Sequence, residues 1–126
     1  MIAMDSRTSS SLWSRDDNQV FLRGRLAAAP VLRTLPSGDE LCTFRLTVAR
    51  PPGDRARVDS VDCASTRVRV RRSVERAEPG DELEVTGSLH RRFWRSPAGL
   101  GSRYEVAVGT ARVSARQARL RQRTGA

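Results

Sequence analysis

Apolar and polar residues alternate with a period of two along most of the chain. The alternation runs through residues 18–26, 42–48 and, more weakly, 58–64, and it returns in 83–89 and 104–113. A period of two is typical of a strand with one buried face. Clusters of Pro, Gly, Ser and Asp separate these segments and indicate turns. The pattern therefore predicts five strands.

One segment has a different period. Between residues 67 and 78 the apolar side chains Val70, Val74 and Ala77 recur at i, i+4 and i+7, with Arg and Glu between them. This spacing predicts a short helix, and Pro79-Gly80 ends it. Three strands, one helix and two strands is the order of the OB-fold, a five-stranded Greek-key barrel that binds oligonucleotides on one face. A generic β-barrel or β-sandwich of similar size is the alternative.

The two ends of the chain lack this periodicity. Residues 1–16 are rich in serine and are expected to form a flexible arm, and residues 115–126 are expected to form a basic, disordered tail. The remaining segment, 17–114, has the length of one ordinary domain.

The charge of the chain narrows the classes of partner that it is expected to bind. Twenty-three basic residues stand against 14 acidic ones, for a net charge of +9, and every basic residue is arginine. Arginine presents a planar fork of donors to phosphates and stacks on bases and aromatic rings. This composition indicates a polyanionic partner, with nucleic acid the first candidate and an anionic membrane surface the second.

The sequence lacks the features that are typical of several other classes of protein. No apolar run approaches the roughly 20 residues of a membrane span. The first residues lack the apolar core of a secretory signal, so a cytoplasmic, nucleoid-associated location is expected. The sequence shows no recognisable catalytic motif. Cys42, Cys63 and a single histidine do not form a metal-binding pattern, and no metal or cofactor is expected. The two cysteines are interpreted as buried thiols.

The stretch GSLHRRFWRSPAGLGSRYEV, residues 87–106, concentrates the aromatic residues. If Leu83, Val85 and Leu89 point inward on the fourth strand, then His90, Arg92 and Trp94 point outward together. An exposed ring beside arginines is what single-strand binders use, because the ring stacks on a base and the cations bind phosphates. The alternative for Trp94 is packing in the core.

The pattern also predicts the positions of other residues in and near this stretch. Phe93 has the opposite parity and is predicted to be in the core. Tyr104 begins the last strand, and its side chain is compatible with a place at the rim of the barrel, in the core or in a binding site. Asp62 falls on the outward face of the third strand, so it either pairs with a nearby arginine or marks an unused end of that face. Residues 95–102 are predicted to form the turn before the last strand.

The ordered set of motifs resembles bacterial single-stranded DNA-binding proteins (SSB). The matching features are NQVFLRGRL, the F-x-L-x-V-x-R strand, a V-x-C strand, the short helix, PGDELEVTGSL, RRFW and R-Y-E-V, over about residues 18–113. The resemblance implies an OB-fold, usually a homotetramer, that coats single-stranded DNA without sequence preference in replication, repair or recombination.

The chain departs from the family where the family stacks bases. Aromatic positions of the family fall on Thr66, on Ser60 and near Pro52, so only Trp94 remains of this set. The acidic C-terminal tip that recruits replication and repair enzymes is replaced by the basic RQRTGA, so that recruitment is not expected. The resemblance therefore implies a short form that binds more weakly and depends more on phosphate contacts.

The outward parity and the resemblance together define ten candidate nucleic-acid-binding residues. They are Arg23, Arg25, Arg33, Arg45, Thr66, His90, Arg92, Trp94, Arg95 and Arg103. The expected partners are single-stranded DNA and further copies of the chain in a dimer or tetramer. A protein–protein adaptor with weakened nucleic-acid binding and an RNA-binding OB domain are the alternative functions.

Overall fold

Five strands close into a ring in the computed structural model, which describes residues 16–55 and 57–117. The ring follows the order β1, β5, β6, β4, β3 and returns from β3 to β1 through the pairs Arg25–Thr47 and Leu26–Leu46. All its pairings are antiparallel except β4–β6, where Cys63 lies opposite Val106. The elements of the ring are β1 (Val20–Leu26), β3 (Glu40–Ala49), β4 (Val58–Ser65), β5 (Glu82–Ser96) and β6 (Gly99–Ala115).

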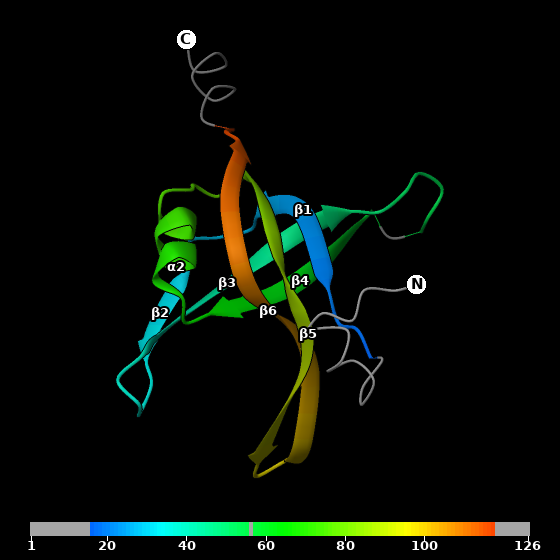
Figure 1. Ribbon diagram of the computed structural model, residues 1–126. Coiled ribbons are helices and arrows are strands. Elements are labelled where there is room, and N and C mark those ends of the chain that lie inside the picture. Colours follow the sequence, from blue (N-terminus) through cyan, green and yellow to red (C-terminus); the bar gives the residue numbers. More distant parts are fainter. Residues whose placement is uncertain (1–15, 56, 118–126) are drawn as a thin grey trace, which may run out of the picture.

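This ring is the predicted OB-fold. The helix α2, Val68–Glu75, connects β4 to β5 and is shorter than the predicted range 67–78. Figure 1 shows α2 beside β6 at one end of the barrel. Val70 and Val74 are buried there. The helix thus places the apolar side chains of its periodic pattern in the core.

A sixth strand was not expected from the sequence. β2, Val31–Thr34, pairs with the first half of β3, and the predicted turn at Pro36–Asp39 joins the two strands. All four residues of β2 are exposed. A short strand without a buried face produces no alternation, which is why the pattern did not show it.

The core is formed by the inward side chains of the barrel strands. Cys42, Phe44 and Leu46 of β3 are buried on one face, as the alternation predicts. Cys63 of β4 is buried and, like Cys42, free. Burial raises the pKa of the Cys63 thiol to about 12 and also raises the pKa of Cys42. The interpretation of both cysteines as small buried thiols is confirmed.

The β5–β6 hairpin extends well beyond the barrel (Figure 1). The predicted turn over 95–102 is wrong, because the strands stay paired as far as Ser96 and Gly99 and only two residues connect them. A register shift lies where the hairpin leaves the barrel, after Thr86. Gly87 is required there, since a Cβ atom on it would overlap the carbonyl oxygen of Ala107. This bulge bends the hairpin, as such irregularities do.

The predicted arm and tail fall largely outside the described residues, at 1–15 and 118–126. Of the predicted tail, Arg116 donates a hydrogen bond to the carbonyl of Arg76 (2.9 Å). The backbone N–H of Gln117 donates to Asp81 Oδ1 (2.7 Å). Within the described part of the chain, no helix has the length and apolar character needed to cross a membrane.

Candidate nucleic-acid interface

A groove of about 390 Å³ crosses the outer face of β2, β3 and β4 and is bounded by the base of the β5–β6 hairpin. The loop Ala27–Ala29 forms part of its wall, and Thr43 and Leu41 contribute to its floor. Four of the ten candidate residues line it. They are Arg33, Arg45, Arg92 and Arg103.

Strand register explains why these four arginines meet. On β3, Phe44 and Leu46 point into the core, so Arg45 between them points outward. On the neighbouring strand β2, Arg33 lies opposite Leu41 of β3. Arg92 and Arg103 lie opposite each other in the hairpin and therefore share one of its faces.

Two carboxylates share the groove with the arginines. Asp62 Oδ1 lies 3.0 Å from Nε of Arg45, and its Oδ2 lies 3.9 Å from Nε of Arg103. Glu105 pairs with Arg92 at 3.1 Å. Asp62 therefore pairs with nearby arginines, which was one of its two predicted roles. With four guanidinium groups and two carboxylates, the groove keeps a net positive charge, although the carboxylates neutralise part of it.

Trp94 lies on the same face of the hairpin as Arg92 and Arg103, two residues further toward the tip. Its side chain is 45% exposed, which excludes the alternative of core packing. The Cζ atom of Arg103 lies 5.7 Å from the centre of the ring. The ring rests on Gly101, where a Cβ atom would come within 2.5 Å of it. Gly101 therefore leaves room for the indole to lie against β6.

Besides Trp94, five candidate residues do not line the groove. Arg23 pairs with Glu84 at 2.8 Å, and Arg25 donates to the carbonyl of Gly80, both on the outside of β1. Thr66 is exposed just before α2. His90 is exposed and hydrogen-bonds Ser88 (2.9 Å) on the groove side of the hairpin. Arg95 lies opposite Leu100 on the other face of the hairpin.

The prediction that Phe93 belongs to the core is wrong, because its side chain is 72% exposed. Phe93 does have the parity of the buried Val85, but the barrel ends before the strand reaches it. Tyr104 is exposed on the same face, at 57%. Parity identified the face of these rings correctly, and only the length of the barrel decides whether a core covers that face.

Asp62→Asn is expected to strengthen oligonucleotide binding by about three- to tenfold at low salt, because the two paired arginines become available to phosphates. The change keeps the size of the side chain and one acceptor oxygen, and it removes the negative charge. Fluorescence titration with oligo-dT at two salt concentrations measures the effect. The exposed Asp54, which lies in the loop between β3 and β4, supplies the control variant Asp54→Asn. Weaker binding by Asp62→Asn than by Asp54→Asn would contradict a role for Asp62 in neutralising the groove.

An OB barrel with a basic groove and an exposed aromatic ring at its edge defines a nucleic-acid-binding module. The model of the single-strand binding protein family matches residues 17–115, so the chain belongs to that family. No curated protein matches the sequence. Among solved structures, "Plasmodium falciparum SSB complex with ssDNA" is similar, with 22% sequence identity and a TM-score of 0.68. The match covers 78% of this chain and 95% of that chain and supports the OB-fold.

Proposed function

We propose that the groove and Trp94 together form the site where this protein holds single-stranded DNA. Single-stranded DNA as the ligand follows from membership of the family. The observation that carries the location is the shared face of the hairpin, where the exposed Trp94 ring continues the line of Arg92 and Arg103. The protein acts by binding rather than by catalysis.

The residues of the site explain binding without sequence preference. Arg33, Arg45, Arg92 and Arg103 meet phosphates, which every nucleotide carries. Trp94 stacks on the flat face of a base, and every base has one. Positions where the family stacks further bases hold Ser60 and Thr66, both exposed, so the groove side offers few rings. Binding therefore relies mainly on phosphate contacts.

The test is a titration of the protein with oligo-dT at two salt concentrations. Each neutralised phosphate of a single strand contributes about −0.7 to the slope of log K against log salt, so four arginines partly paired with acids give a slope of roughly −1.5 to −3. Undetectable binding at low salt, or affinity independent of salt, would overturn the proposal. Equal affinity for duplex DNA would overturn the single-strand assignment, and a preference for oligo-U would support the RNA-binding alternative.

A matched pair of double variants locates the site. Arg33→Ala/Arg45→Ala removes two charges from the groove, and Arg69→Ala/Arg72→Ala removes two from the exposed surface of α2. The groove variant is expected to lose about 1.4 from the size of the slope, and the helix variant is expected to keep the original slope. The reverse result would place the phosphate contacts on α2 instead of in the groove.

Three further features belong to the proposal. The protein acts in the cytoplasm, and its processes are replication, repair or recombination, where single strands are exposed. Members of this family typically form oligomers, and we expect an even-numbered homo-oligomer here as well. A strict monomer in gel filtration with light scattering would contradict that expectation.

A further inference from the structure

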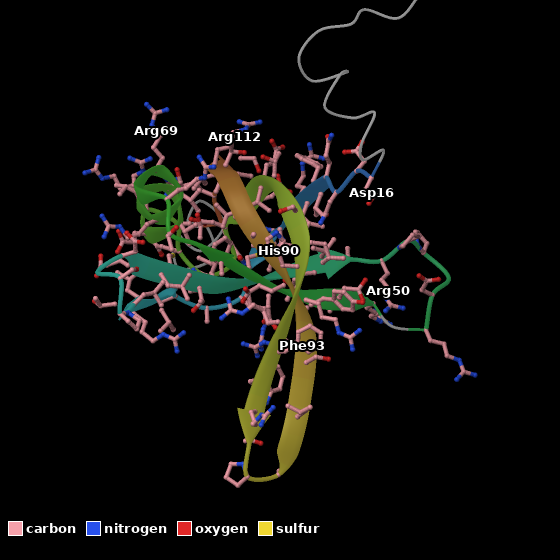
Figure 2. All side chains as sticks on the ribbon, turned by 60° about the horizontal axis from the view of Figure 1, so that its bottom comes forward. Asp16, Arg50, Arg69, His90, Phe93 and Arg112 are labelled. Carbon is pink, nitrogen blue, oxygen red and sulfur yellow. The ribbon has the colours of Figure 1, made fainter. Side chains whose placement is uncertain are left out.

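The face of the hairpin that turns away from the groove carries a second aromatic and basic surface. Its cross-strand pairs beyond the barrel are Arg91–Tyr104, Phe93–Ser102 and Arg95–Leu100. Phe93, Tyr104 and Leu100 are 72%, 57% and 76% exposed. Figure 2 shows Phe93 on the projecting hairpin, with Arg69 of α2 on the opposite side of the molecule. We call these six residues the far face of the hairpin.

We propose that the far face is a second stacking surface for single-stranded DNA, used when a strand is long enough to pass around the hairpin from the groove. This inference rests on the proposed function of the groove. It assigns to Phe93 and Tyr104 the role that the missing family aromatics have elsewhere. Two of the six aromatic residues of the chain are thus placed where a second stretch of the same ligand arrives.

Arg91 connects the two rings. Its Cζ atom lies 5.3 Å from the centre of the Phe93 ring and 5.4 Å from that of Tyr104. Nε and Nη2 of Arg91 also donate to Ser102 Oγ, at 3.1 and 2.9 Å. The guanidinium is therefore held between two exposed rings. Rings that take unstacked bases and a cation beside them for phosphates are the combination that single-strand binding requires.

The charge of the far face favours DNA over a protein partner. None of its six residues is acidic, whereas in the groove Asp62 and Glu105 neutralise part of the positive charge. Arg91 and Arg95 lie on the same side as the rings. A second copy of the chain docked symmetrically on this face would bring four arginines into one interface with no acidic residue of the face to pair with them, which is unfavourable. A polyanion with flat bases complements the face.

The far face also continues directly from the groove. Trp94 and Phe93 are neighbours in the chain and point to opposite sides of the same two-stranded hairpin. A strand that stacks a base on Trp94 therefore needs only to cross the edge or tip of the hairpin to reach Phe93. This path requires more nucleotides than the groove alone, so the length of the oligonucleotide separates the two surfaces.

The experiment compares short and long oligo-dT for the double variant Phe93→Ala/Tyr104→Ala. An oligonucleotide of about eight nucleotides fills the groove, and one of about 30 exceeds the site size of a single OB-fold. We expect the variant to bind the short probe within about twofold of the unmodified protein. We expect the long probe to bind at least about 30-fold more weakly, because two base–ring contacts are lost.

Two controls accompany the double variant. Phe21→Ala removes another exposed ring with an arginine over it (Arg23, 5.6 Å) on the outside of β1, and is expected to leave both affinities unchanged. Phe93→Tyr/Tyr104→Phe keeps both rings and is expected to bind the long probe normally. Thermal unfolding of every variant verifies that the barrel is intact.

The outcomes separate this proposal from the function of the groove. Unchanged binding of the long probe by Phe93→Ala/Tyr104→Ala, with short-probe binding still present, overturns the far face and leaves the groove in place. Failure of the unmodified protein to bind either probe overturns the groove function itself. A lower mass in light scattering for the double variant, with unchanged DNA binding, also overturns the proposal and makes the far face a contact between copies.

Discussion

Trp94→Ala is expected to weaken binding of short oligo-dT by about ten- to 100-fold, the cost of losing one base–aromatic stack. The loss is large because the one aromatic residue that lines the groove, Phe44, belongs to the core and is only 5% exposed. Arg92 and Arg103 remain in the variant, so residual binding should be purely electrostatic and should disappear with moderate salt.

Fluorescence distinguishes stacking from a general loss of affinity. Trp13 is the only other tryptophan of the chain, so titrations in a Trp13→Phe background report on Trp94 alone. Stacking of a base is expected to quench this signal. Trp94→Phe keeps a ring and should retain most of the affinity. Full affinity in Trp94→Ala, or binding without quenching in the Trp13→Phe protein, would show that the indole does not contact the DNA.

Asp81→Ala is expected to lower the free energy of unfolding by about 2–4 kcal/mol, which for a domain of this size lowers the melting temperature by roughly 10–20 °C. Asp81, directly before β5, has 0% relative exposure. Its Oδ2 accepts from the backbone N–H of Glu78 (2.8 Å), and its Oδ1 accepts from that of Gln117 (2.7 Å). The carboxylate thus ties the turn after α2 to the end of β6, and alanine leaves both donors without it.

Asp81→Asn tests whether two acceptor oxygens are needed. The amide offers one oxygen and turns an N–H₂ group toward the other donor. The stability of this variant should therefore lie between that of the unmodified protein and that of Asp81→Ala. Thermal or urea unfolding measures both. Asp54→Ala changes an exposed aspartate in the β3–β4 loop and should leave stability unchanged. Equal stability of Asp81→Ala and Asp54→Ala would contradict this role.

The hairpin carries several of the features on which the proposed function depends. Gly87 allows it to bend away from the barrel, and Gly101 allows Trp94 to lie against it. Beyond the rim its two faces are both exposed, so the strand alternation that elsewhere separates core from solvent here separates two surfaces. A single hairpin can therefore present rings in two directions. This explains why the chain has half its aromatic residues in one basic stretch.

The sequence by itself determined the five strands of the barrel, the helix and the outward side of Arg45, Arg92 and Trp94. These features follow from periods of two and 3.6, which depend only on residues close in the chain. It also indicated a polyanionic partner, since net charge needs no coordinates.

Only the tertiary structure decided which of these side chains meet and which face is covered. Asp62 pairs with Arg103 from a distant strand, and Arg23 is held by Glu84 on another side of the barrel. Phe93 has the parity of a core residue, but it lies in the part of the hairpin that extends beyond the barrel, where no core covers it. Pairing between strands and the point where a barrel ends depend on contacts between residues far apart in the chain, and local periodicity carries no record of them.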